Sequence, residues 1–70
     1  MVPFKYVVYR EDEYYVPQCL NADVSSFGSS VEEAIAQLTD ALKLYLADDS
    51  ERAKFQTVGV AILGEGMVDA

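Results

Sequence analysis

The chain has no histidine and only one cysteine, Cys19. A disulfide within the chain is therefore excluded, and so is a zinc site built from histidine and cysteine. No histidine can activate Cys19 or a serine as a nucleophile. A lone cysteine in a small protein favours a reducing compartment. We expect Cys19 to be a small buried apolar side chain, and we expect no metal and no cofactor.

Long apolar runs and clustered positive charge are missing too. No stretch reaches the roughly 18 apolar residues of a membrane-spanning helix, and the N-terminal MVPFKYVVYR lacks the pattern of a signal peptide. We therefore expect a cytoplasmic protein without a membrane partner. Five scattered Lys and Arg residues stand against twelve Asp and Glu, a net charge of −7. This distribution argues against direct nucleic-acid binding. It suits a basic protein partner, or serves only to keep the protein soluble.

The length predicts one domain with a thin core. A chain of 70 residues hides only about 60% of its unfolded surface when it folds. Self-association is a common remedy in small domains that have neither disulfides nor metals. The hydrophobic fraction of 51% is nevertheless that of a folded protein.

Residue patterns in the first half predict three short strands. β-branched and aromatic residues mark residues 4–10, 14–20 and 23–27. Glu11, Asp12 and Glu13 form a solvated turn between the first two strands. Pro17 cannot donate a backbone hydrogen bond, so its amide position must face an edge or a bulge. We expect residues 21–22 to form a tight turn, because asparagine tolerates positive φ, and Gly28 to end the third strand.

A capped amphipathic helix is the strongest local signal. Ser30 and Glu33 fit a capping box, in which the Ser30 hydroxyl accepts from the Glu33 amide and the Glu33 carboxylate reaches the Ser30 amide. One face of the helix is apolar, and Leu44 stands alone on the outer side. The apolar stripe consists of Val31, Ala34, Ile35, Leu38, Ala41, Leu42, Tyr45 and Leu46. The opposite face carries Glu33, Gln37, Asp40 and Lys43.

The second half ends in one more predicted strand. Residues 48–54 are a polar connection, and residues 55–63, FQTVGVAIL, are apolar on both faces. Such a strand needs cover on two sides, so we expect Val58, Val60 and Ile62 to lie at a contact between copies of the chain. Residues 64–70 resemble a loose tail.

The predicted fold class is α+β with the order β-β-β-α-β in a single domain over residues 1–63. It is a small, mostly antiparallel sheet with one helix packed on it. The carboxylates do not converge on a metal: Glu11, Asp12 and Glu13 share one turn, and Glu32 and Glu33 point about 100° apart on a helix. We therefore expect no enzymatic activity.

Residues 14–46, YYVPQCLNADVSSFGSSVEEAIAQLTDALKLYL, resemble the core of the HicB-type antitoxins of bacterial toxin–antitoxin pairs. The similarity rests on an ordered combination: Tyr-x-Val, Gln-Cys-Leu, Ser-x-Gly, Glu-Glu-Ala and Ala-Leu-x-Leu-Tyr-Leu. These motifs stand at residues 14–16, 18–20, 26–28, 32–34 and 41–46. Residues 57–62 are similar to the closing strand of that family, so the resemblance spans about sixty of the 70 residues.

The resemblance implies half of a ribonuclease-H-like fold without its active site, which forms homodimers or larger homo-oligomers. It also implies a partner, a small basic HicA-type toxin that cleaves RNA with a histidine. Many members carry a C-terminal DNA-binding part, whereas only GEGMVDA follows the last predicted strand here. We expect Glu11, Asp12, Glu13 and Leu44 to contact the partner.

Two other functions are compatible with the residues. The chain could be an orphan domain that associates only with itself, without a toxin partner. Less favoured is a minimal metal-dependent nuclease on a ribonuclease-H-like sheet. The product of a neighbouring gene, a short basic protein with a histidine, would distinguish the first alternative from the antitoxin reading, and a nuclease assay would test the second.

Overall fold

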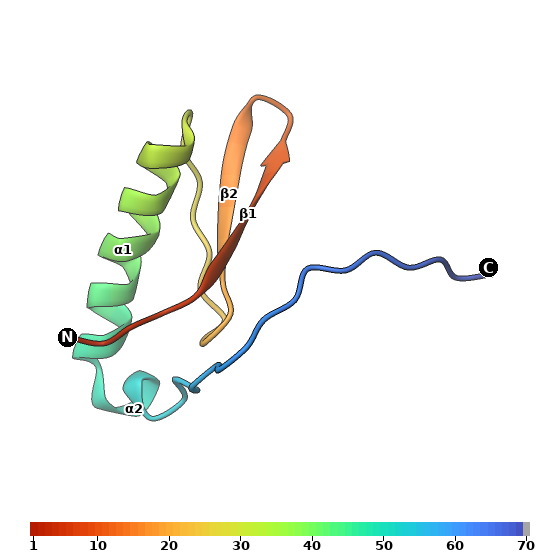
Figure 1. Ribbon diagram of the computed structural model, residues 1–70. Helices are drawn as coiled ribbons and strands as arrows, with labels where there is room; N and C mark the ends of the chain where they lie inside the picture. Colours follow the sequence, from red (N-terminus) through yellow and green to blue (C-terminus); the bar gives the residue numbers. More distant parts are fainter. Residues whose placement is uncertain (70) are drawn as a thin grey trace.

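The computed structural model describes residues 1–69 as a two-layer α+β domain (Figure 1). Strands β1 (Tyr6–Glu11) and β2 (Tyr14–Cys19) form an antiparallel hairpin. Helix α1 (Val31–Ala47) lies across one face of this hairpin, and a short helix α2 (Asp49–Arg52) follows it. The predicted α+β class is confirmed, whereas only two of the four predicted strands are formed as strands in this part of the chain.

The hairpin is joined by a tight turn. Its pairs run from Tyr6 with Cys19 to Glu11 with Tyr14, so that only residues 12 and 13 form the connection. Asp12 has a φ of 54°, in the left-handed region that aspartate tolerates better than most residues. The sequence had suggested such a conformation at residues 21–22. The chain does reverse direction there, since the Cys19 N–H donates to the Val24 carbonyl (2.9 Å), but without a positive φ: Asp12 is the one non-glycine residue with positive φ among residues 1–69.

The predicted third strand is present as an extended segment, residues 24–28, beside β2. Isolated bridges join Tyr15 to Gly28 and Gln18 to Ser25 in one antiparallel register. Within this register the Ser26 N–H donates to the Pro17 carbonyl (3.2 Å). The reciprocal bond cannot form, because proline has no N–H. Pro17 thus interrupts the ladder on this side of β2 and leaves the pairing with β1 intact.

Helix α1 begins as its capping signal predicts, with one difference. The Ser30 hydroxyl accepts from the Glu33 amide (3.1 Å), whereas the Glu33 carboxylate accepts from the Ser29 hydroxyl (2.9 Å) and not from the Ser30 amide. Val31 is 42% exposed, so the buried stripe starts one turn later, at Ala34. Leu44 is 77% exposed on the outer side of the helix, as predicted.

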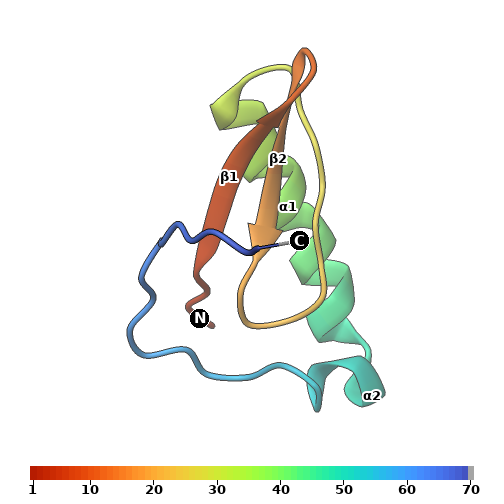
Figure 2. The same cartoon turned by 90° about the vertical axis from the view of Figure 1, so that its right-hand side faces the viewer.

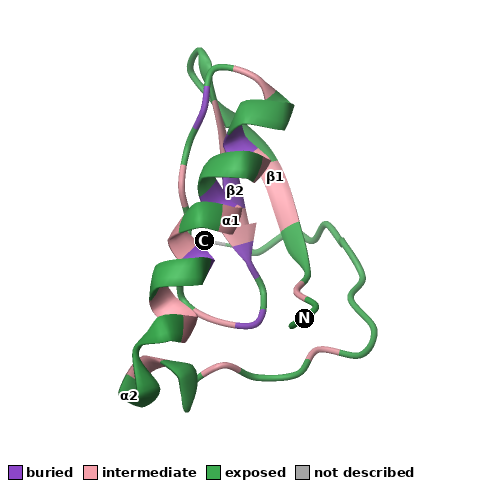
Figure 3. Ribbon diagram, turned by 90° about the vertical axis from the view of Figure 1, so that its left-hand side faces the viewer, coloured by how far each residue is buried: buried purple, intermediate pink, exposed green. Residues whose placement is uncertain are grey.

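The core is small and lies between α1 and β2. Cys19, Leu38 and Leu42 are at most 3% exposed and form one cluster. Figure 3 shows buried positions, in purple, on α1 and β2. Phe4, Val24 and Phe55 pack against its border. The predicted role of Cys19 as a buried apolar side chain is confirmed. Because four segments contribute to so few core residues, loss of any one large side chain removes a substantial part of the core.

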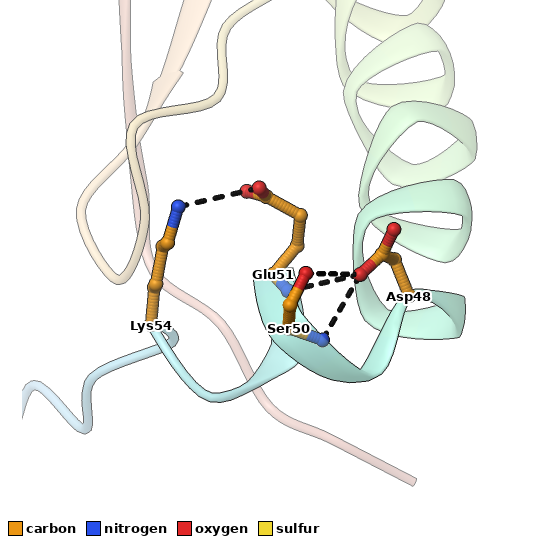
Figure 4. Close-up of polar contacts among 4 residues, drawn as sticks. All are labelled: Asp48, Ser50, Glu51 and Lys54. Atoms are coloured by element: carbon orange, nitrogen blue, oxygen red, sulfur yellow. Dashed lines mark hydrogen bonds and ion pairs between the residues drawn. The ribbon is translucent and has the colours of Figure 1, made fainter.

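The predicted polar connection, residues 48–54, contains helix α2. Asp48 ends α1 and caps α2, because its carboxylate accepts from the Ser50 amide (2.9 Å), the Ser50 hydroxyl (2.7 Å) and the Glu51 amide (3.1 Å) (Figure 4). These bonds favour the ionised form and lower the pKa of Asp48. Lys54 forms an exposed ion pair with Glu51 (3.3 Å), a kind of contact that contributes little to stability.

The predicted strand at residues 55–63 is not formed within the described chain. Phe55 packs on the core, and the chain beyond it continues as an extended segment away from the domain (Figures 1 and 2). Val60, Ile62 and Leu63 are 86–88% exposed. The segment is apolar on both faces, and every residue from 59 to 69 is exposed. The predicted tail, residues 64–70, is extended and exposed as far as residue 69, and its last residue lies outside the described part.

Candidate protein-binding surface

The outer edge of β1 carries unpaired backbone groups. Tyr15 and Cys19 direct their N–H groups to residues 24–28, so the alternate residues of β2, such as Val16, face β1. Val16 pairs with Tyr9. Since backbone groups alternate in direction along a strand, the neighbours of Tyr9 face away from β2. These outward-facing residues are Tyr6, Val8 and Arg10, and β1 has no second strand beside it within residues 1–69.

The sheet face opposite α1 is not covered by a helix (Figure 1), and most of its residues are apolar. Paired residues share a face, and Cys19 and its partner Tyr6 lie on the helix side. The alternate residues therefore lie on the open side. They are Val7, Tyr9, Glu11, Tyr14, Val16, Gln18 and Leu20, with Phe27 opposite Val16 in the register of the third segment. Tyr14 is 46% and Phe27 64% exposed, and such an apolar face marks a candidate contact surface.

Asn21 joins three segments of the chain next to this surface. Its side-chain Oδ1 accepts from the Lys5 amide (2.7 Å), and its Nδ2 donates to the Gln56 carbonyl (2.7 Å). The Gln56 amide donates in turn to the Asn21 carbonyl (2.8 Å). Asn21 is 5% exposed, so these bonds satisfy a buried polar side chain. They hold the start of the C-terminal segment beside the start of β1.

Beyond Gln56, the C-terminal segment borders two hollows together with the N-terminal part of the chain. Residues 57 and 58 line a hollow with residues 2–5, and residues 61–63 line another with residues 5–7 and Leu20. Among the predicted contact residues, Val58 is partly covered, whereas Val60 and Ile62 are exposed.

The acidic turn lies at the tip of the hairpin. Glu11, Asp12 and Glu13 are exposed, and none of them forms an ion pair with another residue of the described chain. Figure 1 places this tip near the beginning of α1, whereas Leu44 belongs to the last turns of the helix. About 20 Å of helix separates its first turn from Leu44. The structure does not bring Leu44 together with the acidic turn, so the two cannot form one compact contact.

Sequence reasoning missed two residues of this region. Asn21 is a clamp, because its side chain bonds to both Lys5 and Gln56, and Phe27 is part of the open face. No pattern marks Asn21, because its partners are distant backbone groups. Phe27 could have been assigned from its alternation with Ser26.

Within residues 1–69, no three His, Cys, Asp or Glu side chains gather in a way that could hold a metal ion. None of the helices described has the length and apolar character needed to cross a membrane. No protein-family model, no curated protein and no solved structure matches the chain.

Proposed function

We propose that the chain is a self-associating protein-binding module similar to the HicB-type antitoxins, which masks a small basic RNA-cleaving toxin in the cytoplasm. One observation carries this proposal. A free sheet edge, an open apolar sheet face and an exposed apolar segment all occur in the same small domain. Such surfaces suit contacts with other proteins. The motifs at residues 14–46 support the choice of family.

In the proposed fold, the C-terminal segment completes the β-β-β-α-β order. Asn21 holds Gln56 beside Lys5, and residues of the segment beyond it border hollows next to residues 2–7. A parallel strand there would satisfy the outward backbone groups of β1. The new strand would form the edge of the sheet, and its second apolar face would lie against another copy. Val58, Val60 and Ile62 are the proposed contact residues.

Net charge supports a basic partner. The protein carries a charge of −7, and the acidic turn at residues 11–13 is exposed at one end of the sheet. Charges of this kind act mainly on the rate of encounter, because exposed ion pairs add little affinity. Apolar contacts with the open face would then hold the complex. Leu44, at the far end of α1, is proposed as a separate contact.

Sedimentation equilibrium tests the self-association. The protein should be a dimer or larger at micromolar concentration, and Val60→Lys should shift it towards monomer. Leu44→Lys is the matched control, since it places the same charge on an exposed apolar position outside the segment. A monomeric wild-type protein, or equal dissociation of both variants, would contradict the proposed contact.

Binding kinetics test the partner. Wild type and a variant with lysine at residues 11–13 are compared against the basic product of a neighbouring gene, at low and high salt. The association rate should fall in the variant and in high salt, because the Debye length is about 8 Å at 0.15 M salt. If no neighbouring product binds, the alternative of an orphan self-associating domain holds. RNA and DNA incubated with the protein and Mg²⁺ or Mn²⁺ should remain uncleaved.

A further inference from the structure

We propose that a groove on the open sheet face, next to the hairpin tip, binds an arginine side chain of a basic protein. This inference rests on the proposed function, since it names the chemistry by which that partner would be held. The groove has a volume of about 440 Å³. The residues that line it are the acidic Glu11 and Asp12, the aromatic Tyr14 and Phe27, and Val16 and Ser26.

An aromatic pair forms one wall of the groove. The rings of Tyr14 and Phe27 lie 5.8 Å apart at 80°, an edge-to-face arrangement. In such a pair, the ring that contributes its edge does not use its own faces in the contact. Both side chains remain about half exposed or more. A guanidinium group can therefore stack on an available ring face, which is the geometry of a cation–π contact.

The rim of the groove supplies negative charge. Glu11 pairs directly with Tyr14 across the hairpin, so their side chains lie next to each other on the open face. Asp12 follows in the turn, held by its left-handed backbone conformation. No Lys or Arg of the described chain forms an ion pair with either carboxylate. Both charges are therefore free to bind a cation from another molecule.

The one nearby arginine of the chain does not fill the groove. Arg10 alternates with Glu11 and so lies on the helix side of the sheet, where its Nε donates to the Asp12 carbonyl (3.1 Å). Arginine suits the groove better than lysine, because a planar guanidinium can stack on a ring and bond to a carboxylate at once. The carboxylates would repel phosphate, so a protein side chain fits this site and a nucleic acid does not.

Titration with capped peptides, followed by NMR of the full chain, tests the site. The probe is acetyl-Gly-Arg-Gly-amide, and the controls carry lysine or uncharged citrulline in place of arginine. The arginine peptide should shift the Tyr14 and Phe27 ring resonances in a saturable manner. Lysine should bind more weakly and citrulline should give no shift, because it lacks the charge. Equal shifts with arginine and citrulline would overturn the proposal.

Two double variants test whether binding of the arginine peptide depends on the groove or only on the net negative charge of the protein. Glu11→Gln with Asp12→Asn removes two charges and keeps the turn, since asparagine also tolerates a positive φ. This variant should weaken arginine binding by about tenfold, which corresponds to about 1.4 kcal/mol. Glu32→Gln with Asp40→Asn removes the same charge from the exposed surface of α1 and should change binding little. Equal weakening in both double variants would show that only net charge matters and would refute the site.

The outcomes also distinguish this inference from the proposed function. If the neighbouring protein binds but the arginine peptide does not, the antitoxin-like function stands and the groove is refuted. If the peptide binds at the groove and no neighbouring protein binds, the groove stands and the antitoxin-like function fails. Phe27→Leu provides a second check, because this exposed side chain can change without loss of the core. It should weaken binding of the arginine peptide while the thermal midpoint stays unchanged.

Discussion

Gly28→Ala tests how closely the third segment packs against α1. Gly28 is buried, and its N–H and C=O groups both bond to Tyr15 (2.9 and 2.8 Å). A methyl group added here would lie 2.5 Å from the Ala34 nitrogen and 2.8 Å from the Ala34 Cα. Those atoms belong to the backbone of the first turn of α1, so no side-chain rotation can relieve the clash. Either the helix must move outwards or the bonds to Tyr15 must break.

The expected cost is about 1–3 kcal/mol or more, the usual range for overpacking. In a domain of this size, 1 kcal/mol corresponds to a shift of about 4–8 °C in the thermal midpoint. Gly28→Ala should therefore lower the midpoint by about 4–24 °C, measured by circular dichroism at 222 nm. Gly66→Ala is the control, because nothing lies within 4 Å of a methyl group there. If both variants unfold at the same temperature, the close contact between the third segment and α1 is not present in solution.

Four further substitutions test the core, the clamp at Asn21 and the junction between the two helices. Leu38→Ala and Leu42→Ala should each cost about 2–5 kcal/mol in urea unfolding, whereas the exposed Gln37→Ala should shift the midpoint little. Asn21→Ala should cost about 1–3 kcal/mol, because two backbone partners lose their bonds. Faster amide hydrogen exchange at the C-terminal side of the clamp would confirm its role, and unchanged exchange would contradict it. Because the fold lowers the pKa of Asp48, its ionised carboxylate contributes its full stabilisation at pH values above 3.8, the ordinary pKa of this group. That contribution is lost as pH falls through the folded pKa, so the stability difference between wild type and Asp48→Ala should shrink on acidification.

Local signals in the sequence were enough for the hairpin, the helix and the core. The cap at Ser30, the spacing of Leu38 and Leu42, and the acidic turn each depend on residues close together in the chain. All of them are present in the structure. The burial of Cys19 was also predictable, because no partner for its chemistry exists in the sequence. Predictions of this kind succeed when all the residues that determine a feature belong to one helix, strand or turn.

Features that depend on distant partners could not be read in the same way. Asn21 bonds to backbone groups of Lys5 and Gln56, which lie 16 and 35 positions away. Asparagine is common in turns, so its local signal predicted a turn conformation instead of a clamp. Gly28 likewise suggested the end of a strand, while its place is fixed by contact with the backbone at Ala34. The third strand is interrupted because the backbone nitrogen of Pro17, which has no N–H, faces it and not β1. The periodicity of the sequence does not predict which neighbour that nitrogen faces.

The segment at residues 55–63 shows the limit of a strand pattern. Its alternation and β-branched residues favour a strand, but no strand is formed at these residues. Fixing each residue costs about 1–2 kcal/mol of conformational entropy, which hydrogen bonds and burial must offset. The edge of β1 can supply hydrogen bonds on one side, but no residue up to 69 covers the apolar faces around Val60 and Ile62. We therefore expect this strand to form only when another chain supplies that cover, so that folding of the segment and association of the protein are one event.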